Sequence, residues 1–447
     1  MKNIFLQFII FLYIIPQFQT YYSFEFKRNI TEKLTYKNLM KNLFTNKLII
    51  NLNIGTPSQK ITTSIKLQSN PFYIFSSNVN DIYFQKFNPS LSSTYYTNFS
   101  KEITFNEEFI KGKWAWDTLT LENGEKINNF QFILASENNK KYFPYSGSII
   151  GLYLNPSLGL SNVKFIEQFR KNNKIKCNCF SIVYEKEDSG IFYFGDYLHE
   201  IKPNKYIYDY FYSINTIQNN YKYEWGIEFD YIKVNERLIR FTKFEFLYPE
   251  LGIIIGSYYY FEIINSTFFD NALKNKSCYT ERFEINDYFE RENYNNINDN
   301  YTYFICDKGK IDLKNFPVLT FKNKKLNVTY FLYGNDLFYE FENKLYFLII
   351  ISDKFKTNML LGKPFFKKTN LVFDLEKKII GTYSYIVINN SKIDMRLFFE
   401  ILACLFFICI LSIGLIYILR NKKRKKRANE LIDNDYEYIT NKGSNIF

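Results

Sequence analysis

Short apolar runs, separated by Gly, Asn or Ser, follow one another along most of this 447-residue chain. Their length and their β-branched and aromatic content are typical of strands. The clearest are Leu48–Ile54, Ile61–Leu67, Phe130–Ala135, Ile191–Phe194, Tyr346–Ile351 and Leu371–Phe373. Few stretches keep a 3.6-residue period for more than two turns, and the best are Asn162–Lys171 and Tyr260–Leu273. The pattern predicts an all-β body with a few short helices.

A weak duplication divides this body. An apolar pair followed by Gly occurs at Ile149-Ile150-Gly151 and again at Leu360-Leu361-Gly362, each late in its half. A body of this length exceeds what one hydrophobic core usually serves. We therefore expect two β lobes, residues 48–205 and 206–386, which follow a short N-terminal segment at residues 21–47.

Both ends of the chain carry membrane signals. Residues 1–20 combine a basic start with a short apolar run, which indicates a cleaved signal peptide, although a buried first strand would look similar. Ile401–Leu419 contains no charge and predicts a transmembrane helix at 397–419, after a stalk at 387–396. Residues 420–447 form a basic tail that belongs in the cytosol. We expect a single-pass type I protein of the secretory pathway or cell surface, with its body lumenal or extracellular.

The net charge of +12 does not indicate a nucleic-acid partner. About +4 of it belongs to the tail, where Lys422–Arg427 is the densest basic run, and the lumenal body keeps only about +7. A basic run beside a span acts as a stop signal and attracts anionic lipid headgroups. The tail also holds Tyr436-Glu437-Tyr438-Ile439, which fits the Y-x-x-Φ pattern read by clathrin adaptors, unless the tail is inert.

Asparagine sequons and cysteines fit a secreted body. Four of the six cysteines lie in the lumenal part, an oxidising compartment, and two lie in the predicted span as small apolar residues: Cys177, Cys179, Cys278 and Cys306, then Cys404 and Cys409. The candidate glycosylation sites are Asn29, Asn98, Asn265, Asn275, Asn300, Asn327 and Asn389.

Six segments of the body form an ordered series. They are Asn51–Gln59, Phe87–Tyr95, Ser148–Leu152, Gly190–Gly195, the strand with Tyr223, Trp225 and Ile227, and the block Leu360–Phe366, Val372–Asp374 and Ile380-Gly381. In content and order they resemble the pepsin-like aspartic protease family over about residues 48–386. The resemblance implies a bilobal pepsin-like fold with an interlobe cleft.

That family cleaves peptides with two aspartates that share a proton, one in each lobe, each within an Asp-Thr-Gly turn. By spacing, the first turn corresponds to Lys66–Ser69 and the second to Ile254–Ser257, so that Lys66 and Ile254 stand at the aspartate positions. The resemblance therefore implies an aspartic protease fold without either catalytic aspartate.

The resemblance also covers the flap, the hairpin that closes over substrate in this family, and here too the family's residues are replaced. Counting back from Asp117, which resembles the aspartate of the strand after the flap, puts Phe105 at the family's tyrosine. The flap glycines correspond to Asn106 and Glu108, and each loss of Gly restricts the backbone. A hairpin that closes over substrate is not expected.

Other chemistries have less support. A desolvated Lys66 could act as a base or nucleophile, but pairing with a nearby Glu is the simpler expectation. His199 is the single histidine and is expected at the surface. One histidine and scattered cysteines give no metal-ligand spacing, so we expect no metal and no cofactor.

The family resemblance also pairs Cys278 with Cys306, closing a loop around the polar stretch Asn286–Asn300, a predicted surface loop. Cys177 and Cys179 lie on one face of an expected strand and are too extended to bond each other. They are expected as buried thiols or as a link to another molecule.

The leading hypothesis is a membrane-anchored, inactive aspartic protease homologue that binds a peptide or protein in or near the interlobe cleft. One alternative is an active endopeptidase whose dyad is misregistered, although the only acids in Phe244–Phe261 are Glu245 and Glu250. The other is a structural surface glycoprotein whose cleft is filled by aromatic side chains.

Overall fold

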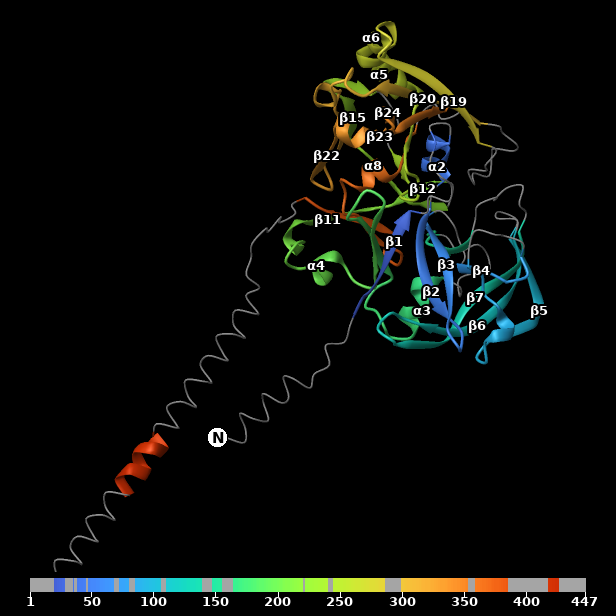
Figure 1. Cartoon of the computed structure of the whole chain (residues 1–447), viewed down its shortest axis with the longest axis vertical. Coiled ribbons are helices and arrows are strands. Elements are labelled where there is room, and N and C mark those ends of the chain that lie inside the picture. The colour runs from blue at the N-terminus through green and yellow to red at the C-terminus, as the bar shows by residue number, and fades with distance from the viewer. Residues whose placement is uncertain are drawn as a thin grey trace, which may run out of the picture. The chain divides into compact units, whose positions relative to one another are not determined.

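The computed structural model describes residues 20–28, 35, 38–45, 47–67, 72–79, 85–105, 110–138, 147–154, 164–219, 222–239, 244–285, 299–352, 358–384 and 417–425. Contacts divide the chain into a body, residues 1–387, and a C-terminal part, residues 388–447. The body is mostly β, as the apolar pattern predicts (Figure 1).

Thirteen strands of the described body form its largest sheet. In spatial order they are β11 (Phe211–Asn215), β28 (Ile379–Tyr383), β27 (Val372–Asp374), β9 (Cys179–Tyr184), β10 (Ser189–Phe194), β1 (Tyr22–Arg28), β2 (Leu48–Ile54), β3 (Gln59–Lys66), β8 (Ser148–Gly151), β4 (Phe72–Phe75), β7 (Lys126–Asn138), β6 (Ile110–Thr120) and β5 (Tyr96–Phe105).

Three further sheets are built from the second half of the body. The largest runs β14 (Gly226–Ile227), β17 (Glu245–Leu247), β26 (Leu360–Leu361), β18 (Ile254–Gly256), β25 (Ile349–Ser352), β20 (Asp299–Asp307), β24 (Lys344–Phe347) and β23 (Phe338–Phe341), with β19 (Cys278–Ile285) on β20. The smaller two are β16 (Arg237–Ile239), β15 (Tyr231–Val234), β21 (Leu319–Asn323) and β22 (Val328–Leu332), and the pair β12 (Ile217–Asn219) and β13 (Lys222–Glu224).

Short helices lie between the strands. They are α2 (Leu39–Thr45), α3 (Phe165–Lys171), α4 (Leu198–Ile201), α5 (Tyr258–Ile264), a π-helix (Asn265–Phe269), α6 (Asp270–Lys274), α7 (Gly334–Leu337) and α8 (Lys363–Phe366). The two predicted helices are confirmed as α3 and as the α5–α6 run. Helix α2 was not predicted.

The side chains of β1 and β2 alternate between a buried face and a more exposed face. Along β2 every second residue is buried, from Leu48 to Ile54, and β1 shows the same alternation. This period of two matches the pleat of a strand, which turns successive side chains to opposite faces. Strand β2 has the bounds that the sequence predicts.

The predicted boundary at residue 205 does not separate the sheets. Strands β11, β27 and β28 come from the second half, yet they extend the largest sheet beyond β9. The indole N–H of Trp225 also donates to the carbonyl oxygen of Leu152, at 2.8 Å. We keep the names first lobe and second lobe for residues 48–205 and 206–386, although strands from both ranges belong to the largest sheet.

The N-terminal segment is built into this fold. Strand β1 pairs with β10 along six residues and with the start of β2, and lies between them in the sheet (Figure 1). Helix α2 follows and lies beside β19 in the second lobe. The segment therefore contacts both lobes.

The C-terminal part is described only at residues 417–425, which are helical and exposed. Within the described residues, no helix has both the length and the apolar character needed to cross a membrane. Most of the predicted span at 397–419, the stalk at 387–396 and residues 1–19 of the predicted signal peptide lie outside the described residues.

Candidate functional site

Two groups of four strands, one in each lobe, have the same connections. In the first lobe β3 runs parallel to β8, β8 is antiparallel to β4, and β4 runs parallel to β7. In the second lobe β17, β26, β18 and β25 repeat these three relationships in the same order. Strand β17 is therefore the counterpart of β3, and β18 is the counterpart of β4.

The register of these ladders identifies the residues that correspond. Lys66, the last residue of β3, lies opposite Gly151. In the second lobe Leu247 lies opposite Leu361, and the N–H of Tyr248 donates to the carbonyl oxygen of Leu361, at 2.9 Å. The next residues in register are Tyr248 and Gly362, so Tyr248 is the counterpart of Lys66.

This register corrects the sequence-based placement of Ile254. Ile254 begins β18, one strand later than the counterpart of Lys66, and its side chain is fully buried. The error arose because the stretch Ile253-Ile254-Ile255-Gly256 has the apolar run and the glycine that a strand-and-turn pattern calls for. Only the ladder partners distinguish two adjacent short strands of similar composition.

The turn after β17 is held by residues of the first lobe and of the N-terminal segment. Arg28, at the end of β1, donates from Nη2 to the carbonyl oxygen of Glu250 at 2.8 Å and to that of Pro249 at 3.4 Å. The hydroxyl of Tyr184 also donates to the carbonyl oxygen of Pro249, at 2.8 Å. The position of Tyr248 is therefore fixed by contacts that cross the molecule.

The carboxyl group of Glu250 is the acidic group of this turn. Burial raises its pKa to about 7, and Lys66 and Arg28 oppose that rise by favouring the charged form. The backbone N–H of Leu67, next to Lys66, also acts on this carboxyl. The two counterpart turns thus bring together a carboxyl and a lysine, where a shared-proton dyad would require two carboxyls.

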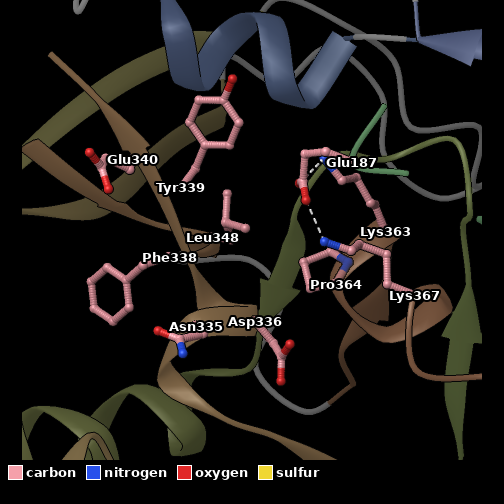
Figure 2. A pocket seen from close by; sticks show the side chains of 10 residues that line it. All are labelled: Glu187, Asn335, Asp336, Phe338, Tyr339, Glu340, Leu348, Lys363, Pro364 and Lys367. Carbon is pink, nitrogen blue, oxygen red and sulfur yellow. Dashed lines mark hydrogen bonds and ion pairs between the residues drawn. The ribbon is translucent and has the colours of Figure 1, made fainter. Parts of the chain in front are cut away.

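A second group of charges lies beside this turn, around a pocket of about 200 Å³ between the first-lobe loop at Glu187 and the second-lobe strand β23 (Figure 2). Lys363, the first residue of α8, has a side chain only 1% exposed. Its Nζ lies 2.5 Å from Oε1 of Glu187 and 3.0 Å from Oδ1 of Asp188. Glu187 also pairs with Lys367.

The pKa values show how the members of this group act on each other. Burial lowers the pKa of Lys363, and the nearby Arg28 lowers it further, whereas Asp188 and Glu187 oppose that effect. Burial would raise the pKa of Glu187, but Lys363 and Lys367 outweigh it and lower the pKa. We call Arg28, Lys66, Lys363, Glu187, Asp188 and Glu250 the interlobe charge cluster; it holds three cations and three acidic groups.

Helix α2 covers the second-lobe side of the site. Its apolar residues Leu39, Met40, Leu43 and Phe44 are each at most 6% exposed and pack with residues of β17, β18, β20, β24 and β26. The carbonyl oxygen of Leu43 accepts a hydrogen bond of 2.8 Å from the N–H of Gly252. In Figure 2 the α2 ribbon, in blue, passes next to the ring of Tyr339 at the pocket.

The hairpin of β5 and β6 stands where a flap is expected. Phe105 ends β5 and pairs with Ile110, while Asn106 and Glu108 lie outside the described residues. Asp117 in β6 is buried and accepts hydrogen bonds from the hydroxyl of Thr94 and from the N–H of Thr118. Asp117 thus has a structural role at the base of this hairpin.

His199 is not a surface residue, contrary to expectation. Its side chain is 8% exposed and is surrounded by Tyr197, Tyr208, Phe211 and Tyr383. Its Nδ1 lies 2.9 Å from the hydroxyl of Tyr383, and burial lowers its pKa. The apolar spacing of α4 involves Leu198 and Ile201 and does not indicate this burial, which depends on the rings of Phe211 and Tyr383.

One cysteine prediction is confirmed and one is wrong. Cys278 and Cys306 form a disulfide between β19 and β20. Cys177 and Cys179 bond each other, because Cys177 lies in a bend before β9. Their Cα atoms are 5.2 Å apart, against ~6.6 Å for two steps along an extended strand.

The remaining predicted residues differ in their surroundings. Asn275 and Asn327 are exposed, as a glycosylated asparagine must be, and the amide of Asn265 donates to Asp270. Asn98 and Asn300 lie in β5 and β20. Asn29, Asn389, Tyr436 and Ile439 lie outside the described residues, as does most of the loop Asn286–Asn300. In the described part of the chain, no cluster of His, Cys, Asp or Glu is placed to bind a metal ion.

Residues 47–384 match the family profile described as "Eukaryotic aspartyl protease". No curated protein shows significant sequence similarity to the chain. The matched range begins one residue before β2 and ends one residue after β28. It therefore covers both lobes and leaves out β1 and α2.

Proposed function

Because the chain belongs to the eukaryotic aspartyl protease family, we propose that it is an inactive member, a membrane-anchored protein that binds a peptide or protein segment without cutting it. The observation that carries the proposal is the pair Lys66 and Tyr248: Lys66 is the last residue of β3, and Tyr248 directly follows the equivalent strand β17. Aspartic proteolysis needs two carboxyl groups that share one proton, one acting as base and the other as acid. Neither a lysine nor a tyrosine supplies such a group.

Glu250 does not replace the dyad. It is a single carboxyl, and its neighbours Lys66 and Arg28 are cations rather than a second acid. A cation beside a carboxylate removes the reason for the two groups to share a proton. This is why an active endopeptidase is the less favoured function.

The surface under α2 supports binding of a segment. Leu39, Met40, Leu43 and Phe44 follow the i, i+1, i+4, i+5 spacing of one helical face, and the second-lobe sheet buries that face. Full burial of such side chains stabilises by about 1.5–3 kcal/mol each. A partner segment with the same apolar spacing would compete with α2 for this surface.

The same contacts support a second candidate, a structural glycoprotein whose ligand surface is permanently filled. Here the filling element would be α2 rather than scattered aromatic side chains. The two candidates differ in whether α2 can be displaced.

The loss of hydrolysis is tested with the purified full chain against a broad peptide library between about pH 3 and 7, with and without a statine inhibitor. We expect no inhibitor-sensitive cleavage. The matched variant is Lys66→Asp with Tyr248→Asp, which restores two carboxyls, compared with each single substitution. Inhibitor-sensitive cleavage by the unsubstituted chain would disprove the inactive assignment.

Binding is tested by measuring how much of a peptide library the full chain retains. Leu43→Ala with Phe44→Ala loosens α2 without changing Lys66 or Tyr248, and should raise retention at least about tenfold. Lys41→Ala, on the exposed side of α2, is the matched control and should change nothing. Equal retention by all three proteins would favour the structural glycoprotein.

The anchor at 397–419 and the lumenal position of the body are proposals of the same kind. In membranes of expressing cells, alkaline carbonate should leave the chain in the pellet. Added protease should remove only the tail at 420–447. Release by carbonate would rule the anchor out.

A further inference from the structure

The two disulfides of the described body close loops of very different length. Cys278 and Cys306 are 28 residues apart and lie opposite each other in β19 and β20. Cys177 and Cys179 are 2 residues apart and close a loop of three residues. Because closing so short a loop removes little chain entropy from the unfolded state, the second bond contributes little to stability.

Hydrogen bonds already hold the backbone around Cys177 and Cys179. The N–H groups of Lys176 and Cys177 both donate to the carbonyl oxygen of Gly195, each at 3.1 Å, and the N–H of Gly195 donates to the carbonyl oxygen of Cys179 at 2.9 Å. The N–H of Leu375 donates to the carbonyl oxygen of Asn178, also at 2.9 Å. The bend before β9 can therefore persist when the sulfur–sulfur bond opens.

The surroundings of the two sulfurs are unequal. Cys177 is partly exposed, whereas Cys179, at the start of β9, is fully buried. Both Cys278 and Cys306 are buried. A thiolate from outside can therefore approach Cys177 but not the other three sulfurs, and accessible disulfides are the ones that exchange readily.

Asn178 adds an indication that the reduced form is tolerated. The residue is 7% exposed, and its Oδ1 is buried without a hydrogen-bond partner among the described residues. Reduction would create two S–H groups, one on each neighbouring residue. A thiol is a weak donor that such an acceptor can use.

From this asymmetry we propose that Cys177 and Cys179 form a thiol–disulfide exchange site for an accessible thiol, either of a small molecule such as glutathione or of a cysteine in another secreted polypeptide. The thiolate attacks Sγ of Cys177, a mixed disulfide forms, and the bond to Cys179 breaks with its electron pair on Sγ of Cys179, which takes a proton from water. A second thiolate then attacks the partner's sulfur in this mixed disulfide, and the bond to Cys177 breaks with its electron pair on Sγ of Cys177, which also takes a proton from water. The partner is oxidised to a disulfide, and the pair is reduced by two electrons to a dithiol.

The first test is a titration of the purified full chain in buffers of graded reduced-to-oxidised glutathione ratio. Free thiols are trapped by alkylation and assigned by peptide mass spectrometry, which distinguishes these cysteines from Cys404 and Cys409. We expect Cys177–Cys179 to open at a ratio on the order of a hundredfold lower than Cys278–Cys306 needs. Opening of both disulfides at the same ratio would refute the proposal.

The second test identifies the attacked sulfur and the kind of thiol. The Cys177 thiolate of Cys179→Ser should attack a disulfide and keep a stable mixed disulfide, with oxidised glutathione in one arm and with the disulfide form of a two-cysteine peptide in the other; one thiol is released per adduct. The wild-type chain, with its own disulfide intact, should oxidise about one equivalent of the reduced form of that peptide, and Cys177→Ser with Cys179→Ser should oxidise none. An adduct with glutathione alone assigns the small thiol as partner. No adduct in either arm, or free thiols at both positions in the protein as purified, would contradict the exchange site.

Discussion

The carbonyl oxygen of Leu43 and the N–H of Gly252 form a 2.8 Å hydrogen bond that joins the N-terminal segment to the turn after β17. This contact is close: a Cβ atom at Gly252 would lie 2.4 Å from the same oxygen. Helix α2 and the turn that carries Tyr248 therefore fit together only with glycine at this position. The N-terminal segment is therefore part of the structure that forms the site.

Gly252→Ala should therefore push α2 away from the second lobe. Overpacking of this kind costs about 1–3 kcal/mol, so the thermal midpoint should fall by several degrees. The amides of Leu39–Thr45 should also exchange faster with solvent. Lys41→Ala is the control for a change within α2. Unchanged amide exchange in Gly252→Ala would show that α2 is not held by this contact.

Glu250 should make the folded chain more stable in mild acid. Its pKa is about 7 when folded, against a reference of 4.5. Between these two pH values the folded chain holds the proton and the unfolded chain does not, so stability gained through Glu250 rises as pH falls from 7 to 4.5, by up to about 3 kcal/mol.

Glu250→Gln should remove this dependence. Denaturant unfolding at several pH values measures the difference between the two proteins, which cancels the contribution of other titrating groups. A constant difference between pH 7.5 and 4.5 would contradict the raised pKa.

Arg28 should be a strong contributor to the contact between β1 and the second lobe. Arg28→Met removes two hydrogen bonds to carbonyl oxygens and a cation from the interlobe charge cluster. A hydrogen bond from a charged donor contributes about 1.5–3 kcal/mol, so the free energy of unfolding should fall by at least this amount. The neighbouring exposed Lys27→Met should cost less than about 0.5 kcal/mol in the same chemical unfolding experiment. Similar losses for both variants would rule out a special role for Arg28.

The two disulfides should differ in their effect on stability. Replacing Cys278 and Cys306 by serine frees a loop of about 29 residues and should cost roughly 3–4 kcal/mol. The same change at Cys177 and Cys179 should cost under about 2 kcal/mol, because the loop is only three residues long. Thermal unfolding of the two double variants compares them directly, and an equal loss would show that Cys177–Cys179 is a structural bond.

Local pattern was enough for much of the fold. The short apolar run Leu48–Ile54 predicted β2, and the ordered segments led to the family that the profile match then confirmed. The pairing of Cys278 with Cys306 was implied by the same resemblance and is confirmed. These features depend on residue type and on spacing along the chain, which a sequence records directly.

Features that depend on distant partners were placed wrongly or missed. Ile254 was placed at the aspartate position because the apolar stretch before Gly256 fits a strand-and-turn pattern. Only the parallel pairings, of β17 with β26 and of β18 with β25, show that Tyr248 is the residue in register with Lys66. His199 is buried by rings from Phe211 and Tyr383, which lie up to 184 residues away. The bend at Cys177 depends on hydrogen bonds to Gly195.

By itself the sequence determined the β-rich body and the family, because both follow from the identity and order of residues. Only the tertiary structure decided that Tyr248 is the partner position, that Glu250 lies near Lys66, and that α2 covers the site. The physical reason is that strand register, burial of charge and the docking of a short helix are set by contacts between segments far apart in the chain.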